Sequence, residues 1–142
     1  MGRYSVREEI KDTAESFYRA LSTRNLKTID KIWAHEQYAA VVGPYGKVEQ
    51  GWPGVHQFFV RRFQQLAGTT ITVRLSNIVL HVVGDVAWFS GTERRTIREG
   101  DGVRQEDLRA TVVLERKSSG WQIVSYHVSQ PAEEPEALFA AS

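Results

Sequence analysis

The sequence predicts an α+β fold in which three N-terminal helices pack on one face of an antiparallel sheet. Apolar residues recur every three or four positions between Ser5 and Leu21, as they do on one face of a helix. From Thr70 onward, four long β-like runs follow one another and are separated by short turn signals. Because the helical signals come first and the strands after them, we expect the helices to cover one face of the sheet.

Each predicted helix has its own boundary signals. Ser5, with a glutamate three residues later, fits a capping box for the first helix. Asn25 is a suitable N-cap for a second, short helix, and residues 38–46 give a β-like run that ends in a strong turn signal. Gly51 opens a third helix in the sequence Gly-Trp-Pro-Gly, and Gly68 ends it.

The second half of the chain is predicted to be an antiparallel meander. Short Gly, Asp and Ser sequences of the hairpin type join its strands. The predicted strands are 70–83, 86–99, 103–116 and 121–130. We expect one domain over residues 1–130 and a mobile tail over residues 131–142.

Composition excludes several classes of function. The 142 residues carry a formal net charge of +1, which gives no electrostatic case for nucleic acid or a membrane surface as a partner. The chain has no cysteine, so disulfides, thiolate catalysis and iron–sulfur clusters are excluded. It shows no phosphate-binding glycine loop, so no cofactor is expected. A polar N-terminus and the lack of a long apolar stretch predict a cytoplasmic protein.

Six sequence motifs together carry a family resemblance. They are Ile32-Trp33, Gly43-Pro44-Tyr45-Gly46, Gly51, Gly84-Asp85-Val86-Ala87-Trp88, Arg109–Leu114 and Gly120–Ser129. With them the chain resembles the nuclear transport factor 2-like superfamily and, within it, the SnoaL-like branch. The last motif is also similar to the end of the association domain of calcium/calmodulin-dependent kinase. The resemblance implies a cone-shaped domain whose strongly bent sheet encloses a pocket, and a homodimer formed through the outer face of the sheet.

The resemblance also allows one known reaction to be tested against this chain. Relatives similar to steroid isomerase need a tyrosine on the first helix, a carboxylate base after the second helix and an acid on a late strand. The corresponding positions here fall at or beside Phe17, near Val42-Gly43 and near Ala110, and none carries the required group, although Tyr18 is one residue from the first. Steroid isomerase chemistry is therefore disfavoured.

Aromatic residues make up 11% of the chain, and some of them are expected to line the implied pocket. Period-two alternation places Leu108 and Tyr126 on the strand faces that the resemblance directs inward. The predicted lining is mostly apolar, which suits a small apolar, cyclic or polyketide-like molecule. The expected ligand-binding residues are Phe17, Tyr18, Trp52, Phe58, Trp88, Leu108, Ala110, Val112, Val124 and Val128.

Four residues are candidates for acid–base chemistry, and each also has a structural interpretation. Tyr126 and His127 lie on the last strand, where His127 could act as a base or belong to a dimer face. Glu36 could point into the pocket mouth or lie at a solvated helix end. Arg94 could bind a carboxylate or enolate, but a cross-strand ladder of paired charges is favoured. The four histidines lack the spacing of metal ligands, so no metal site is expected.

Three hypotheses about function remain. The first is a SnoaL-like protein that binds a small molecule, and the second is a cofactor-independent isomerase, cyclase or dehydratase acting on a carbonyl substrate in the same pocket. The third is a dimerisation module with a vestigial pocket. An inward carboxylate or histidine within about 3 Å of a second polar group would favour the enzyme. A pocket filled by side chains would favour the module.

Overall fold

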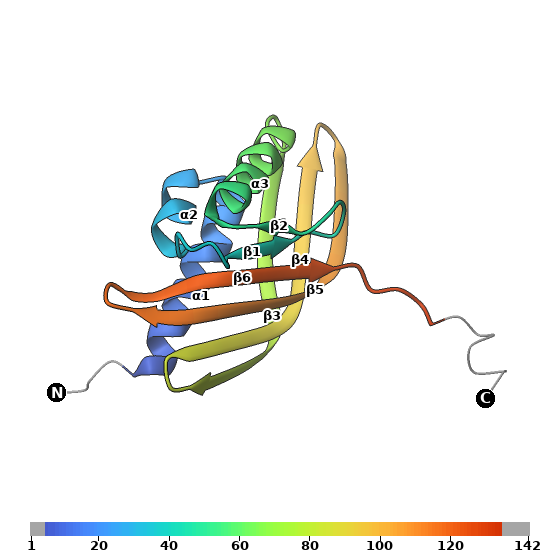
Figure 1. Cartoon of the computed structure of the whole chain (residues 1–142). Helices are drawn as coiled ribbons and strands as arrows, with labels where there is room; N and C mark the ends of the chain where they lie inside the picture. Colours follow the sequence, from blue (N-terminus) through green and yellow to red (C-terminus); the bar gives the residue numbers. More distant parts are fainter. Residues whose placement is uncertain (1–4, 135–142) are drawn as a thin grey trace.

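The computed structural model describes residues 5–134, and in it three helices pack against one bent sheet (Figure 1). The helices are α1 (Val6–Thr23), α2 (Leu26–Ile32) and α3 (Trp52–Gln65). The strands are β1 (Ala40–Val42), β2 (Glu49–Gln50), β3 (Thr70–Val83), β4 (Val86–Glu99), β5 (Gly102–Lys117) and β6 (Gly120–Ser129). The predicted α+β fold is confirmed, and Figure 1 shows the long strands curving around the helices.

The predicted helix starts are confirmed by their caps. The Ser5 hydroxyl accepts a hydrogen bond of 3.2 Å from the backbone N–H of Glu8. The Asn25 side chain likewise accepts one of 3.2 Å from the N–H of Thr28. Each cap satisfies a backbone donor that the first helical turn would leave unpaired.

The sheet has the strand order β2-β1-β6-β5-β4-β3. The predicted meander of β3 to β6 is antiparallel throughout, but β1 pairs with β6 in parallel, so the sheet as a whole is mixed. Strand β2 was not predicted, because two residues are too few to show a period-two pattern.

An irregularity in β3 helps to bend the sheet. The register with β4 shifts between Ser76 and Val79, where Asn77 adopts a φ of 55°. Opposite this bulge lies Gly91, where an added Cβ would be 2.6 Å from the Ser76 carbonyl oxygen. A bulge bends a strand and increases its twist, and a glycine opposite allows the two backbones to approach closely.

A second register shift, between Val113 and Leu114, corrects the predicted alternation on the last strand. Leu114 pairs with Ile123 and Val113 pairs with Ser125, so Val124 has no partner in the register. Ile123 and Val124 are consequently both buried, whereas simple alternation placed them on opposite faces. Beyond the bulge, alternate side chains again face opposite sides of the sheet as predicted, and Tyr126 and Val128 face inward.

The core lies between the helices and the concave face of the sheet. Aromatic rings form its centre, with the Phe17 ring 4.8 Å from that of Tyr126 and 6.2 Å from that of Phe59. Trp33 joins them at 5.6 Å from the Phe59 ring. Of the predicted C-terminal tail, residues 131–134 are exposed without regular structure, and the remainder lies outside the described residues.

Candidate functional site

A cavity of about 270 Å³ lies between α3, the loop joining β1 to β2, and the concave face of the sheet. Its walls are mainly apolar, and α3 contributes three phenylalanines to them. The apolar lining consists of Leu21, Phe58, Phe59, Phe63, Leu66, Ile71 and Val73. Most polar side chains at the cavity lie in two groups, one at the floor and one at the rim.

Local sequence places α3 over the sheet. Gly51 precedes the helix with a φ of 79°, a backbone conformation that side-chain-bearing residues rarely adopt, and Pro53 lies in the first turn. Helical spacing then turns Phe59 and Phe63 into the cavity on one stripe. Gly43 lets the Phe58 ring approach the β1–β2 loop, since an added Cβ would lie 3.0 Å from that ring.

The floor is a buried network of three polar side chains. Glu93 and Arg95 lie two residues apart on β4 and face inward, and Tyr126 reaches them from β6. Arg95 Nε donates a hydrogen bond of 2.7 Å to Glu93 Oε2, and the Tyr126 hydroxyl donates one of 2.6 Å to Glu93 Oε1. Arg95 Nη2 lies 3.4 Å from the Tyr126 hydroxyl oxygen and donates to it.

The neighbours of Arg95 in this network offset the effect of burial on its charge. Burial acts to lower the pKa of Arg95, but Tyr126 and Glu93 outweigh it and raise that pKa above its ordinary value. Burial, and then the negative charge of Glu93, raise the pKa of Tyr126 well above 10.0. The Arg95 guanidinium is therefore charged and the Tyr126 hydroxyl is protonated at neutral pH.

Only part of this network reaches the cavity. Arg95 and Tyr126 line it, whereas the Glu93 side chain is 0% exposed and lies behind them. Both Glu93 oxygens accept hydrogen bonds from its two neighbours. Glu93 thus holds the guanidinium and the phenol in place without contacting the space a ligand would occupy.

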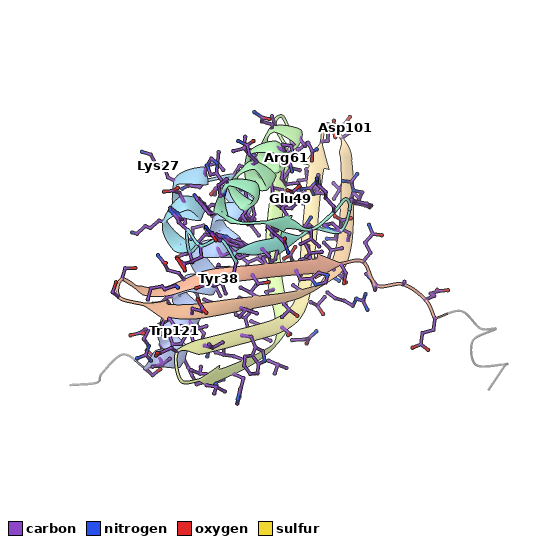
Figure 2. All side chains as sticks on the ribbon, viewed as in Figure 1. Lys27, Tyr38, Glu49, Arg61, Asp101 and Trp121 are labelled. Atoms are coloured by element: carbon purple, nitrogen blue, oxygen red, sulfur yellow. The ribbon has the colours of Figure 1, made fainter. Side chains whose placement is uncertain are left out.

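At the rim, charged residues of α3 face the β1–β2 region. Arg61 Nη2 donates a hydrogen bond of 3.1 Å to Glu49 Oε1, and Figure 2 shows these two side chains next to each other. The adjacent Arg62 is half-buried, lines the cavity and makes no hydrogen bond or ion pair with any described residue. Burial, and then the positive charge of Arg95, lower the pKa of Arg62.

Tyr18 lies next to the floor network from the side of α1. Its hydroxyl is buried and has no hydrogen-bond partner of ordinary geometry in residues 5–134. Burial, the neighbouring Tyr126 and the charge of Glu93 together raise the pKa of Tyr18. Tyr18 does not line the cavity; it contributes to an open groove of about 950 Å³ between α1 and β3.

The structure brings few of the predicted ligand-binding residues to the cavity. Phe58 lines it, while Phe17 is fully buried behind the Tyr126 ring and Trp52 stacks on His35 at 4.1 Å. The remaining inward-facing predictions are buried in the core but do not line the cavity: Leu108, Ala110, Val112, Val124 and Val128.

Trp88 requires a correction. It was expected at the pocket, yet it lies on the outer face of the sheet with 37% of its surface exposed, 4.9 Å from the His81 ring. Its neighbours Ala87 and Phe89 point into the core instead. Alternation along β4 therefore excludes Trp88 from the cavity.

Three of the four predicted acid–base residues lie away from the cavity. His127 is exposed beside Thr111 on the convex side, and Glu36 Oε2 lies 3.4 Å from Lys117 Nζ, next to the turn that joins β5 to β6. Arg94 is exposed and binds both oxygens of Asp107, at 2.9 and 3.1 Å. Arg94 is therefore part of the cross-strand ladder. Tyr126 lines the cavity.

Sequence reasoning missed three residues of the site, namely Glu93, Arg95 and Arg62. Glu93 and Arg95 flank Arg94, for which a cross-strand ladder of paired charges was favoured, and no role was predicted for Arg62. A usable signal was present, because period-two alternation from the buried Ala87 and Phe89 also directs Glu93 and Arg95 inward.

In residues 5–134, no group of three or more His, Cys, Asp or Glu side chains is arranged to hold a metal ion. No helix in the same range is long and apolar enough to cross a membrane.

Comparison with known proteins identifies relatives of the same architecture. The protein-family model that describes the SnoaL-like domain matches residues 10–133 of this chain. A comparison with curated proteins gives no significant match.

Solved structures similar to this chain come from several bacteria. A protein of the nuclear transport factor 2-like family from Streptomyces avermitilis, proposed to be a dehydratase, is 24% identical with a TM-score of 0.78; the match covers 89% of this chain and 96% of that one. A nuclear transport factor 2-like superfamily protein from Salmonella enterica serovar Typhimurium is 20% identical, with a TM-score of 0.79 and coverage of 92% and 94%.

A third similar structure comes from Thiobacillus denitrificans and is proposed to be a calcium/calmodulin-dependent protein kinase type II association domain. It is 20% identical with a TM-score of 0.71, and the match covers 86% of this chain and 94% of that one. At such identities the likeness establishes the fold and leaves the activity to be argued from the site.

Proposed function

The chain belongs to the SnoaL-like domain family, and we propose that it binds a small organic molecule in the cavity between α3 and the sheet. The single observation that carries this proposal is the unfilled space bordered by aromatic side chains, with a fixed guanidinium and phenol at its floor. Apolar walls with a few placed polar groups are typical of small-molecule sites.

The size of the cavity limits the ligand. About 270 Å³ lies just below the range of roughly 300–1,000 Å³ typical of small-molecule sites. The rings of Phe58, Phe59 and Phe63 offer flat apolar surfaces for stacking or edge contacts. A compact ligand of one or two rings fits both features, in agreement with the expected cyclic ligand.

Titration with a neutral two-ring probe, 1-naphthamide, tests the binding proposal by isothermal titration calorimetry. Phe58→Ala should weaken binding, because it removes a ring of the cavity wall at a half-buried position. Trp88→Ala is the matched control, since it removes an aromatic side chain from the outer face. If Trp88→Ala abolishes binding and Phe58→Ala does not, the ligand site is elsewhere.

An enzyme acting on a carbonyl substrate is the second candidate, and the Tyr126–Glu93 contact favours it. The distance of 2.6 Å meets the criterion of an inward carboxylate within hydrogen-bond reach of another polar group. However, Glu93 does not reach the cavity, and the Tyr126 hydroxyl already donates a hydrogen bond to it. Binding without turnover is therefore the leading proposal. Loss of turnover in Tyr126→Phe, with the fold intact, would instead support catalysis by Tyr126.

We further propose that the protein forms a homodimer through the convex face of the sheet. This dimer accompanies ligand binding and replaces the hypothesis of a dimerisation module with a vestigial pocket. Exposed apolar residues gather there on β3 and β4, including Val79, Val83, Val86 and Trp88. Exposed apolar groups of this kind mark interaction surfaces. Light scattering should give a dimer mass for the wild type and a monomer mass for Trp88→Arg, whereas Val103→Arg on the distal end of β5 should leave the mass unchanged.

A further inference from the structure

We propose that the ligand of this cavity carries a carboxylate, which Arg62 binds together with the free side of the Arg95 guanidinium. This inference rests on the proposed small-molecule binding and specifies the chemical class of the ligand. It depends on three features of the described residues: an unpaired cation, an excess of positive charge around the cavity and a preorganised donor.

The unpaired cation is Arg62. Its side chain lines the cavity from α3 and is half-buried, yet it has no hydrogen bond or ion pair with a described residue. A guanidinium has five N–H donors and remains charged under all physiological conditions. Such a group, partly removed from water with no partner, is stabilised when an anion enters the same space.

The charges around the cavity do not balance. Arg61 is paired with Glu49, and Arg95 is paired with Glu93. Lys47, on the exposed β1–β2 loop, is the other cation at the rim. No carboxylate lining the cavity is left to compensate Arg62, so the space carries an excess of positive charge. Burial first, and then repulsion from Arg95, lower the pKa of Arg62, while the charge of Glu106 opposes this shift.

Arg95 supplies a preorganised donor. Its Nε and Nη2 atoms bond to Glu93 and Tyr126, which fixes the plane of the guanidinium. Its Nη1 atom takes part in neither bond, and the residue lines the cavity. A fixed guanidinium edge loses little entropy when it binds a planar carboxylate, because its orientation is already set.

The test compares a matched acid and amide, 1-naphthoate and 1-naphthamide, by isothermal titration calorimetry. The two probes share a ring system and differ in the charge of one polar group. We expect the wild type to bind 1-naphthoate roughly tenfold or more tightly than 1-naphthamide, as charge-assisted hydrogen bonds predict. Arg62→Met should lose that preference for the acid and keep its affinity for the amide.

Arg98→Met is the matched control, because it removes the same charge from an exposed position of β4 that does not line the cavity. It should reduce the acid preference less than twofold. Equal affinity of the wild type for acid and amide would overturn the carboxylate inference and leave the proposed function intact. Binding of neither probe would overturn both. An unchanged acid preference in Arg62→Met, with wild-type circular dichroism, would overturn the assignment to Arg62.

Discussion

The Tyr126 hydroxyl donates a hydrogen bond to Glu93, whose side chain has no contact with solvent. The bond joins the last strand to the middle of β4, across β5, and it satisfies one oxygen of a buried carboxylate. Tyr126 is therefore at once part of the cavity lining and part of the compensation for a buried charge.

Replacing Tyr126 with phenylalanine should destabilise the protein. The substitution leaves Glu93 Oε1 without a donor in the interior, which costs roughly 1–3 kcal/mol of unfolding free energy. Urea denaturation measures this loss. Tyr38→Phe is the control, because Tyr38 also bonds a glutamate but is 54% exposed, so water can replace its hydroxyl. Equal losses in the two variants would contradict the importance of burial.

Replacing Tyr18 with phenylalanine should have the opposite effect. The Tyr18 hydroxyl is buried without a hydrogen-bond partner of ordinary geometry in the described range, so its removal relieves a desolvation cost. We expect the free energy of unfolding to rise by roughly 1 kcal/mol in urea denaturation. A decrease instead would mean that the hydroxyl contributes a favourable interaction with Glu93.

The same two tyrosines predict a loss of stability at alkaline pH. Their pKa values are raised in the folded state above the ordinary 10.0. Above about pH 10 the unfolded chain releases these protons while the folded protein keeps them, so stability falls as pH rises, by about 1.4 kcal/mol per pH unit for each group. Tyr18→Phe should show a shallower decline between pH 10 and 11 than the wild type. Identical slopes would contradict the assignment.

Arg62→Met should stabilise the ligand-free protein. It removes an unpaired, half-buried charge that faces Arg95 and retains an apolar chain of similar length. The expected gain is roughly 0.5–1 kcal/mol by chemical denaturation. Arg61→Met, which breaks the ion pair with Glu49, should give no gain. A marked loss in Arg62→Met would indicate that Arg62 supports the fold.

Gly91→Ala should be strongly destabilising. An added Cβ would lie 2.6 Å from the Ser76 backbone oxygen, so β3 and β4 would have to separate at the bulge. We expect a loss of roughly 1–3 kcal/mol, as for overpacked interiors. Gly102→Ala provides the comparison on a neighbouring strand, because there the closest atom would be 3.4 Å away. Thermal unfolding of both variants should separate the two cases clearly.

The elements of this fold could be predicted from the sequence because each carries a local signal. The caps at Ser5 and Asn25 and the glycine-rich turns mark boundaries directly. Distant pairing has no such signal, which is why the parallel pairing of β1 with β6 was not foreseen. Bulges also break simple alternation, as the shared burial of Ile123 and Val124 demonstrates.

The candidate site could be predicted only in part. Tyr126 and Phe58 were recognised because aromatic residues in a small apolar pocket are an expected pattern. Trp88 was misplaced because a large ring is equally acceptable on an outer face. Glu93 and Arg95 were missed because charged residues are normally exposed. Here their mutual ion pair offsets the desolvation cost of burying both charges.

The parallel contact of β1 with β6 also sets the order in which the molecule can be completed. Val41 pairs with Tyr126, and Trp33 bridges to Ile123, so segments from the first third of the chain find some of their partners in its last strand. On the ribosome, these pairings of β1 and Trp33 cannot form until β6 has emerged. Contacts of such sequence separation slow folding and expose nascent chains to aggregation. A nascent chain arrested before Trp121 should therefore depend on chaperones, although it already contains all three helices.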